Sequence, residues 1–510
     1  MLNTVPVSHA QLLQFADRIA LDDGEQQLSY HELALQVSIL SAWLVASPYQ
    51  RIAISGDNSI AWVIADLALA QANKIAIPVP VFFSAQQQQF MLAEAGVELV
   101  LQTQATEQSQ PTVIDGLWAK RLNPVEHHAT SMPISSGKIT FTSGTTSTPK
   151  GVCLSWKQQA ATCDGLQQAL AEQFSGAPQL HYCLLPLATL LENVAGVYLP
   201  LRLGQRVLIL SAAKTGLAGS SGLDLPTFIA SLLQYRPASL ILTPQLLQAL
   251  LLICRQHPEL SRTFRFIAVG GAHCAKALLT QAAALKLPIF QGYGLSEAGS
   301  VVALNLPQQQ RQNSVGKPLP HVAVRVRQQH IEVNGQLFSG YLGEMPRDPE
   351  AWLDTGDLGY LDEDGYLVIQ GRSKHLLISS YGRNISPEWL EAELQSCPAI
   401  AQAMVLGDAK PWLSVVLTLR ANASKQTLQQ QLSQLNTQLP DYARLRTVLV
   451  INTPFTQANQ QLTANGRLRR QPIIEQYQTA IEQLYQQQPD PLIPTIMAVA
   501  AKEELTYEFF

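Results

Sequence analysis

The amino-acid sequence predicts an α/β protein that has a large N-terminal domain and a small C-terminal one. Through the first two-thirds of the chain, short runs of β-branched and aliphatic residues alternate with amphipathic segments of helical period. This alternation is typical of parallel sheets, because the crossovers between parallel strands are normally helical. Near residue 320 the pattern becomes strictly alternating, which indicates a small antiparallel region. After residue 371 it changes again, to that of an α+β domain.

The parallel layers are predicted from strands and from the helices between them. The expected strands are RIAISG (51–56), ELVLQT (98–103), KITFTS (138–143), CLLPL (183–187), RVLIL (206–210), SLILT (239–243) and FIAVG (266–270). Helices are expected at AWVIADLALAQA (61–72) and FIASLLQY (228–235). The segment AVRVRQQHIEVNGQLF (323–338) is expected to form antiparallel strands that divide at Asn334-Gly335, a favoured hairpin turn.

The domains are expected to be a large domain at 1–371, a hinge at 372–376 and a small mobile domain with a tail at 377–510. Beyond the hinge, Ser386 is predicted to cap a helix that has Pro387 at its first position. The glutamine-rich tract 425–438 is predicted to be a solvated helix. The tail PLIPTIMAVAAKEELTYEFF is either a helix docked on the small domain or a contact for a partner.

The composition narrows the classes of function. The chain has 510 residues, of which 47% are hydrophobic and 14% charged, so a large core is expected and disorder is not. The net charge of −4 and the lack of a long basic run argue against nucleic acid as a partner. No signal peptide or transmembrane segment is recognised, and six cysteines without a CxxC pair predict reduced, mostly buried thiols. A cytoplasmic location is expected.

The stretch TFTSGTTSTPKG (140–151) concentrates small donors and glycines beside one cation, Lys150. It follows a predicted strand, where glycines would let consecutive amides and hydroxyls face an anion. Its spacing is not that of the GxxxxGK[ST] phosphate loop. Taken alone, the stretch leaves two interpretations open, a phosphate loop of another kind and a polar surface loop.

Four further segments follow it in order along the chain. They are QGYGLSEAG (291–299), WLDTGDLGYLDEDGYL (352–367), GRSKHLLISSYGRNISPEWLE (371–391) and LTANGRLRR (462–470). GLSEAG is one residue too long for the GxSxG elbow of hydrolases. Asp357 is expected in a turn, where its carboxylate could accept two vicinal hydroxyls, and the last segment is expected to be a basic loop turned by glycine. Together the motifs resemble the adenylate-forming superfamily, most closely its acyl-CoA synthetases and fatty acid ligases.

The resemblance extends from about residue 28 to residue 470 and implies a two-step reaction. ATP and a carboxylic acid give an acyl-adenylate and pyrophosphate, and the thiol of coenzyme A or of a carrier protein's phosphopantetheine then takes the acyl group. The resemblance implies the following nucleotide-binding residues: Thr142, Ser143, Gly144, Thr145, Thr146 and Lys150 at the β- and γ-phosphates, Gly270, Gly271 and Ala272 at the adenine, Gly292, Tyr293, Gly294 and Ser296 in the base-stacking turn, and Asp357 and Arg372 at the ribose.

The resemblance also implies the residues of catalysis and of domain movement. Glu297 would bind Mg²⁺, and Lys150 and Arg467 would take part in catalysis. Lys374 would lie at the hinge, and Gly382 in the loop that approaches the acceptor thiol. The family usually carries a lysine at the position of Arg467. Arginine keeps the charge but spreads it over a planar fork, which predicts slow adenylation.

The substrate is expected to be a hydrophobic acid, with a long-chain fatty acid favoured. Around Leu187 and Ala188, where relatives that activate amino acids place an aspartate, the sequence is apolar, and Glu192 is interpreted as structural. In the same segment Thr189 replaces a histidine usual in long-chain synthetases. The alternative function is a protein that binds ATP or acyl-adenylate and has lost adenylation through Arg467.

Overall fold

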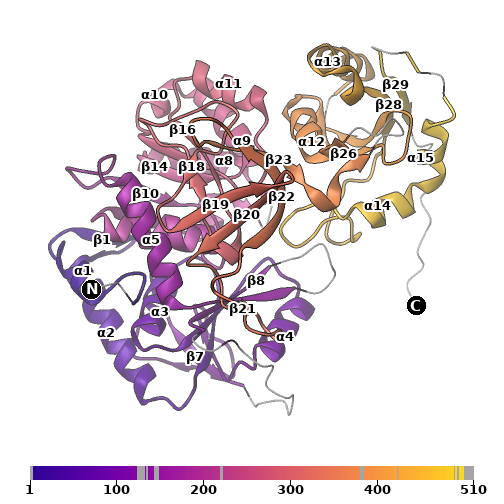
Figure 1. Cartoon of the computed structure of the whole chain (residues 1–510). Helices are drawn as coiled ribbons and strands as arrows, with labels where there is room; N and C mark the ends of the chain where they lie inside the picture. Colours follow the sequence, from indigo (N-terminus) through magenta and orange to yellow (C-terminus); the bar gives the residue numbers. More distant parts are fainter. Residues whose placement is uncertain are drawn as a thin grey trace. The chain divides into compact units, whose positions relative to one another are not determined.

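The computed structural model describes residues 4–498 apart from 123–132, 134–135, 143–148, 219–221, 379–383, 422, 488 and 491–492. It forms two compact units (Figure 1). The first unit comprises Met1–Ala272, Gln281–Thr355 and Tyr360–Val368, and the second comprises His273–Thr280, Gly356–Gly359 and Ile369–Phe510. The predicted hinge at 372–376 stays a prediction.

The first unit contains a nine-stranded sheet with a parallel centre, in the order β18-β17-β16-β15-β14-β10-β11-β1-β2. Its strands are β1 Ile19–Asp22, β2 Gln27–Ser29, β10 Leu180–Cys183, β11 Arg206–Ile209, β14 Ser239–Leu242, β15 Phe266–Val269, β16 Ile289–Tyr293, β17 Ala303–Leu304 and β18 Lys317–Pro318. The pairings from β16 to β1 are all parallel, and the outer strands pair antiparallel.

A second large sheet of the first unit has eight strands in the order β21-β9-β8-β4-β3-β5-β7-β6. Its strands are β3 Arg51–Ser55, β4 Ile75–Val79, β5 Leu99–Gln102, β6 Gln110–Pro111, β7 Trp118–Arg121, β8 Lys138–Thr142, β9 Lys150–Leu154 and β21 Gly340–Tyr341. β5, β3, β4 and β8 run parallel, whereas β8, β9 and β21 are antiparallel neighbours. These two sheets confirm the predicted α/β class.

Helices connect most of the parallel strands, and several of them begin at capping residues. Those that begin before residue 285 are α1 His9–Leu13, α2 Tyr30–Ala46, α3 Ile60–Gln71, α4 Ala85–Glu94, α5 Trp156–Leu170, the π-helix η1 Glu192–Tyr198, α6 Leu199–Arg202, α7 Ala212–Thr215, α8 Leu225–Tyr235, α9 Pro244–Gln256, α10 Pro258–Ser261 and α11 Lys276–Ala284. Ser155 caps α5 in a reciprocal capping box with Gln158. Thr243 caps α9, which has Pro244 at its first position.

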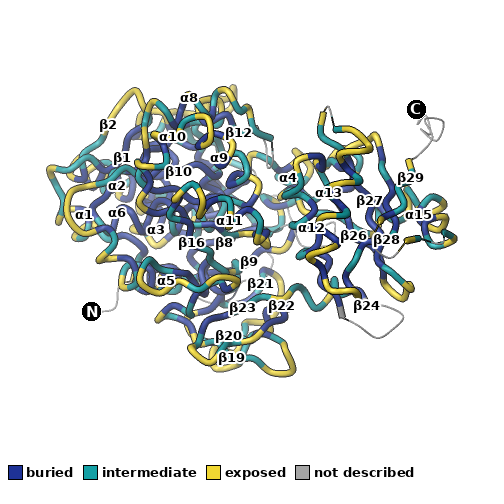
Figure 2. Tube along the Cα trace, turned by 90° about the horizontal axis from the view of Figure 1, so that it is seen from above, coloured by how far each residue is buried: buried dark blue, intermediate teal, exposed yellow. Residues whose placement is uncertain are grey.

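The predicted antiparallel region forms a four-stranded sheet in the order β19-β20-β22-β23. Its strands are β19 Val322–Arg327, β20 His330–Gly335, β22 Leu353–Leu361 and β23 Leu367–Arg372. The turn predicted at Asn334-Gly335 is wrong, because β19 and β20 are joined by Gln328-Gln329. Both glutamines have positive φ angles, of 48° and 67°, and a two-residue turn of this kind matches the right-handed twist of the strands that it joins. Figure 2 shows the hairpin tip as exposed.

The strand predicted at 183–187 is also wrong, since β10 ends at Cys183. Beyond Cys183 the chain makes hydrogen bonds with a side chain instead of a neighbouring strand. The Asn58 amide donates to the Leu185 carbonyl oxygen at 2.9 Å and accepts from the Leu187 amide at 2.8 Å. Pro186 has no amide hydrogen, so the segment could not have continued a central strand.

The second unit contains the α+β sheet β26-β27-β28-β29 with its helices. Its further elements are η3 Ser373–His375, β24 Leu377–Ile378, β25 Asn384–Ile385, α12 Pro387–Ser396, β26 Ile400–Leu406, β27 Leu413–Leu419, α13 Lys425–Gln438, η4 Asp441–Ala443, β28 Leu445–Val450, α14 Arg470–Gln476, α15 Gln478–Leu484 and β29 Thr495–Ala498. The glutamine-rich helix is confirmed as α13. The first described part of the tail is a strand, β29, and not the docked helix that was one of the two expectations.

Ser386 occupies the predicted capping position and Pro387 the first position of α12. The serine hydroxyl does not bind the helix amides, however, but donates to Glu388 at 3.1 Å. The six cysteines are unpaired, and all are buried except Cys397, which is partly exposed. Of the helices within the described ranges, none combines the length and apolarity needed to cross a bilayer.

A buried ion pair ties three elements of the first unit together. The Lys138 ammonium, at the start of β8, lies 2.7 Å from the Asp66 carboxylate on α3, and both side chains are 1% exposed. Lys138 also donates to Asn193 Oδ1 at 2.6 Å and to the Tyr198 hydroxyl at 2.9 Å, both on η1. Asn193 and Tyr198 in turn donate to Asp66. Two hydrogen bonds and the ion pair with Asp66 therefore surround the ammonium, as a buried charge requires.

Breaking this pair should destabilise the first unit. Asp66→Asn keeps the shape of the side chain but leaves the Lys138 charge buried without an anion, so we expect a loss of about 3–5 kcal/mol. Guanidinium unfolding followed by tryptophan fluorescence would report it, since the Lys138 ammonium lies 5.3 Å from the ring centre of Trp156. The control Glu344→Gln removes an ion pair that is more than half exposed and should cost at most about 1 kcal/mol. Equal losses in the two variants would contradict the assignment.

Candidate functional site

The predicted phosphate loop connects the antiparallel strands β8 and β9. Thr142 ends β8, Lys150 begins β9, and the two residues pair directly across the hairpin. Lys150 is exposed, and its ammonium lies 3.1 Å from the Glu344 carboxylate. Ser143, Gly144, Thr145 and Thr146 lie outside the described residues. The Lys150 side chain therefore places a positive charge directly after the predicted phosphate loop.

Two glycine-containing turns leave the carboxyl ends of neighbouring parallel strands. Gly270, Gly271 and Ala272 follow β15, while Gly292 and Tyr293 end β16, and Val269 pairs with Gln291. A Cβ on Gly270 would lie 3.4 Å from the Gly292 carbonyl oxygen, so the two turns pass close to each other. Ligands of open parallel sheets bind at this edge. The structure thus brings the predicted adenine loop and the predicted stacking tyrosine to one edge.

The turn after Tyr293 depends on the absence of a side chain at Gly294. A Cβ there would lie 1.6 Å from the Ser300 carbonyl oxygen, which no rearrangement of side chains could relieve. The tight turn leads into the short 3-10 helix η2, Ser296–Ala298, which carries both Ser296 and Glu297. Gly299 then ends this helix in the left-handed conformation, with φ of 68°.

Glu297 and Lys150 are connected through one aromatic side chain. The Tyr341 hydroxyl donates to Glu297 Oε1 at 2.8 Å, and the Lys150 ammonium lies 4.9 Å from the centre of the Tyr341 ring. Burial, and then the Glu297 charge, raise the pKa of Tyr341, so the hydroxyl stays protonated and can donate. The structure therefore joins two predicted site residues through a third that the sequence analysis did not select.

The Glu297 carboxylate suits a magnesium ion that arrives with a nucleotide. Magnesium prefers hard oxygen ligands and is commonly bound by one or two carboxylates together with substrate phosphates. Within the described ranges, no group of three or more histidine, cysteine, aspartate or glutamate side chains could form a metal site from protein ligands alone. The donor set fits a metal bound jointly with a triphosphate, and when bound such an ion supplies positive charge at the phosphates.

The predicted ribose pair is present as an ion pair. Arg372 Nε, at the end of β23, lies 2.7 Å from Asp357 Oδ1, with Asp357 6% and Arg372 42% exposed. The expectation that Asp357 lies in a turn is wrong, because it lies within strand β22. β22 and β23 are neighbours in one sheet, and this pairing brings the two side chains together. Both residues belong to the second unit, whereas the glycine-containing turns belong to the first.

The remaining predicted residues lie in the second unit. Lys374 is exposed on the short helix η3, and Gly382 lies outside the described residues. Arg467 is exposed in a tight loop, as predicted, where its amide donates to Thr463 Oγ1 at 3.0 Å. Gly466 turns this loop with a φ of 73°. The Arg467 amide and carbonyl both pair with Thr463, and the residue is exposed.

The apolar segment predicted to contact the substrate contains a buried acid. Leu187 and Ala188 are buried, and Glu192, at the start of η1, is fully buried. Neither carboxylate oxygen makes a regular hydrogen bond, and burial raises the pKa of Glu192 to about 8. The nearby Cys183 thiol and Leu184 and Leu185 amides offset this effect only in part. Glu192 is therefore mainly neutral at pH 7, and its interpretation as structural stays a prediction.

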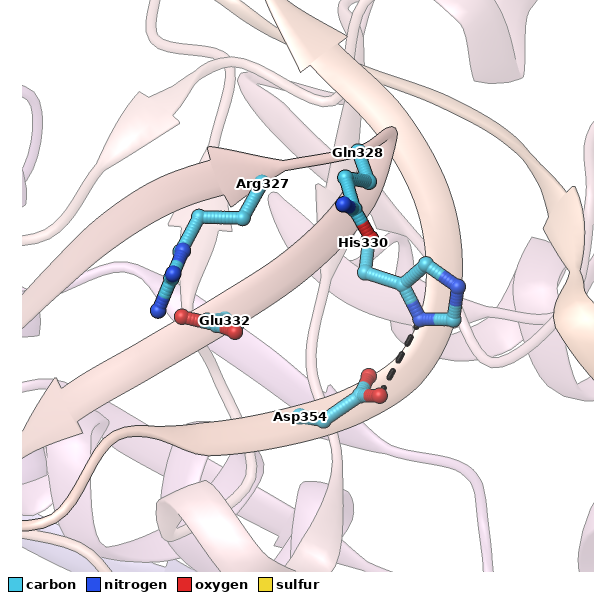
Figure 3. Close-up of a pocket in the computed structure, with 5 residues that line it drawn as sticks. All are labelled: Arg327, Gln328, His330, Glu332 and Asp354. Atoms are coloured by element: carbon cyan, nitrogen blue, oxygen red, sulfur yellow. Dashed lines mark hydrogen bonds and ion pairs between the residues drawn. The ribbon is translucent and has the colours of Figure 1, made fainter.

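A polar pocket of about 540 Å³ lies at the exposed end of the β19–β20 hairpin (Figure 3). It is lined by Arg327, Gln328, His330, Glu332 and Asp354. His330 Nδ1 lies 3.0 Å from Asp354 Oδ2. None of the five residues was predicted to bind nucleotide, and their mixed charges do not select an anion.

Tyr341 and Glu344 belong to the candidate site, although no motif indicated them. Both lie in SGYLGEMP (339–346), and the only local signal is a tyrosine between glycines after an apolar pair. Tyr341 reaches the site because β21 pairs with β9, with Tyr341 opposite Val152. That pairing joins segments far apart in the sequence, so the motif alone could not have indicated it.

The fold is that of the adenylate-forming enzymes. The family model for AMP-binding enzymes matches residues 9–342, and the model for the AMP-binding enzyme C-terminal domain matches residues 374–489. The chain belongs to the AMP-binding enzyme family, which confirms the resemblance identified from its motifs.

Particular relatives are CoA ligases for different acids. The chain is 23% identical to the long-chain-fatty-acid–CoA ligase FadD15 of Mycobacterium bovis, over 89% of this chain and 91% of that protein. It is 27% identical to the 2-succinylbenzoate–CoA ligase of Enterococcus faecalis, over 84% and 88%. The fold matches that of Bacillus subtilis o-succinylbenzoate CoA synthetase in complex with the acyl-adenylate intermediate OSB-AMP. That match has a TM-score of 0.70 and 22% identity, over 91% of this chain and 97% of that one. The same synthetase in complex with ATP and magnesium ion gives a TM-score of 0.70 and 23% identity, over 90% and 98%.

The buried acid should make stability depend on pH. The ordinary pKa of glutamate, 4.5, applies in the unfolded chain, so that state releases the Glu192 proton first as pH rises. The contribution of Glu192 to the free energy of unfolding should therefore decline from about pH 4.5 to pH 8, by on the order of 3–5 kcal/mol. Glu192→Gln should remove this decline. Chemical unfolding of both proteins across that range would measure it, with the exposed Glu172→Gln as control, and equal pH slopes for Glu192→Gln and the natural protein would contradict it.

Proposed function

We propose that this protein is an AMP-forming acid–CoA ligase that activates a long-chain fatty acid. Its two half-reactions would be formation of an acyl-adenylate with release of pyrophosphate, and transfer of the acyl group to the thiol of coenzyme A. The observation that carries the proposal is the joint presence of Lys150 and Glu297 within the AMP-binding match, and of Asp357 and Arg372 in the stretch between that match and the C-terminal one. A protein that only bound acyl-adenylate would have no need of a metal-binding carboxylate.

The electrostatic problem of the first step supports these roles. A carboxylate must attack the α-phosphate of a polyanion, so the site has to supply positive charge and oriented donors. Lys150 and the donors of 142–146 would hold the β- and γ-phosphates, and Glu297 would hold Mg²⁺ against them. Gly270, Gly271 and Ala272 would border the adenine, Tyr293 would stack on it, and Asp357 with Arg372 would hold the ribose.

The choice of a fatty acid rests on the segment 184–198 and on a relative. Leu187, Ala188, Leu190 and Val194 are buried apolar residues, and Glu192 is mainly neutral, so this segment offers no anion for the ammonium of an amino acid. The Mycobacterium bovis relative is a long-chain-fatty-acid–CoA ligase, which also favours coenzyme A over a carrier protein. The 2-succinylbenzoate ligases make an aryl acid the main competing substrate.

Pyrophosphate exchange across a panel of acids tests the substrate. We expect exchange with octanoate, laurate and palmitate, and kcat/KM should rise with chain length. Each additional methylene buried in an apolar site contributes about 0.8 kcal/mol, or about fourfold. Benzoate, 2-succinylbenzoate and malonate serve as comparisons. A preference for 2-succinylbenzoate over every fatty acid would refute the fatty-acid assignment while leaving the ligase assignment intact.

The arginine at position 467 tests the first half-reaction. Arg467→Lys restores a compact ammonium, so we expect pyrophosphate exchange to rise by about tenfold or more. Transfer from a synthetic acyl-adenylate to coenzyme A should change little. Arg469→Lys, in the same loop, is the matched control. Lower exchange in Arg467→Lys would mean that arginine itself serves adenylation. Absence of exchange in the natural protein and in Arg467→Lys would favour the alternative of a binding protein without adenylation activity.

A further inference from the structure

The segment 338–342 joins the two parts of the first unit to which phosphate and metal binding are assigned. On one side, β21 pairs with β9, and the Leu342 amide donates to the Gly151 carbonyl oxygen at 2.8 Å. On the other side, the Phe338 amide donates to the Glu297 carbonyl oxygen at 2.7 Å. One short stretch of backbone therefore fixes the strand that begins at Lys150 relative to the turn that carries Glu297.

The Tyr341 side chain repeats this connection between the two charged groups themselves. Its hydroxyl donates to Glu297 Oε1 at 2.8 Å. The Lys150 ammonium lies over its ring, 4.9 Å from the ring centre. The Phe338 ring packs edge-on against it, with the ring centres 4.9 Å apart. A tyrosine has only two side-chain torsions, and contacts on three sides fix the position of its hydroxyl.

A hydrogen bond to one carboxylate oxygen has a defined effect on a metal ligand. It sets the plane of the carboxylate and leaves the other oxygen able to face a cation. Hydrogen bonds of this kind to metal ligands typically change metal affinity by about 10–100-fold when they are removed. The Lys150–Glu344 ion pair has no comparable effect, because both side chains are more than half exposed and a triphosphate can replace Glu344.

We propose that Tyr341 is a positioning residue that orients the Glu297 carboxylate for the magnesium ion of the incoming ATP and places Lys150 beside it. The proposal rests on the proposed function, since it concerns the same nucleotide site. Tyr341 takes no part in bond formation. It acts through Glu297, so its hydroxyl should matter for ATP only when the metal is present.

The test measures equilibrium binding of ATP by calorimetry, with Mg²⁺ and with a chelator, for the natural full-length protein and for Tyr341→Phe. The affinity for ATP with Mg²⁺, divided by the affinity for ATP with the chelator, should fall by about tenfold in Tyr341→Phe. Binding of metal-free ATP should stay within about twofold, because the ring beneath Lys150 is kept. Mn²⁺ followed by electron paramagnetic resonance in the presence of ATP should show the same loss of affinity. Tyr360→Phe, which removes the hydroxyl of an exposed tyrosine, is the matched control.

A double-mutant comparison with Glu297→Gln shows whether Tyr341 acts through that carboxylate. If it does, Tyr341→Phe should lower the affinity ratio in the natural background and not in the Glu297→Gln background. An unchanged ratio in Tyr341→Phe, or an equal fall in Tyr360→Phe, would overturn the proposal. Failure of the natural protein to bind ATP under either condition would instead refute the proposed function, so the two failures are distinguishable.

Discussion

The first unit depends on the ion pair between Asp66 and Lys138, which are almost completely excluded from solvent. Each charge would be costly to bury alone, so α3, β8 and η1 are held in the one arrangement that satisfies both. Lys138 begins the strand that leads to the predicted phosphate loop, and Asn193 and Tyr198 belong to the segment assigned to the acyl chain. One polar network thereby connects the strand before the predicted phosphate loop with the segment assigned to the acyl chain.

The residues of the candidate site in the first unit are brought together by β-sheet pairing. The β8–β9 hairpin sets Lys150 opposite Thr142, and β21 adds Tyr341 to the same sheet. The neighbouring parallel strands β15 and β16 bring two glycine-containing turns to one edge, and the absence of a Cβ at Gly294 permits the turn that presents Glu297. Glycines supply the shape of this region, while a few charged or aromatic side chains supply its chemistry.

The parallel strands and their helices could be predicted because aliphatic runs and capping residues are local signals, as at β14 and α9. The errors occurred where a longer-range contact decided the structure. After Cys183 the backbone makes hydrogen bonds with the Asn58 side chain instead of a neighbouring strand. The hairpin turn is formed by Gln328-Gln329 and not by Asn334-Gly335. Asp357 was selected from its motif but misplaced in a turn, because its pairing with β23 is not visible locally. Tyr341 was missed for the same reason.

The sheet of the second unit is completed by an element that is translated after every other one described. β29 pairs parallel with β28, with Thr447 beside Thr495, and it lies beyond residue 489, where the match to the C-terminal family model ends. During synthesis, β28 therefore emerges with one edge uncovered, and that edge is covered only after residues 495–498 have left the ribosome. The four-stranded sheet of this unit therefore cannot reach its final hydrogen bonding before the residues of β29 have been synthesised.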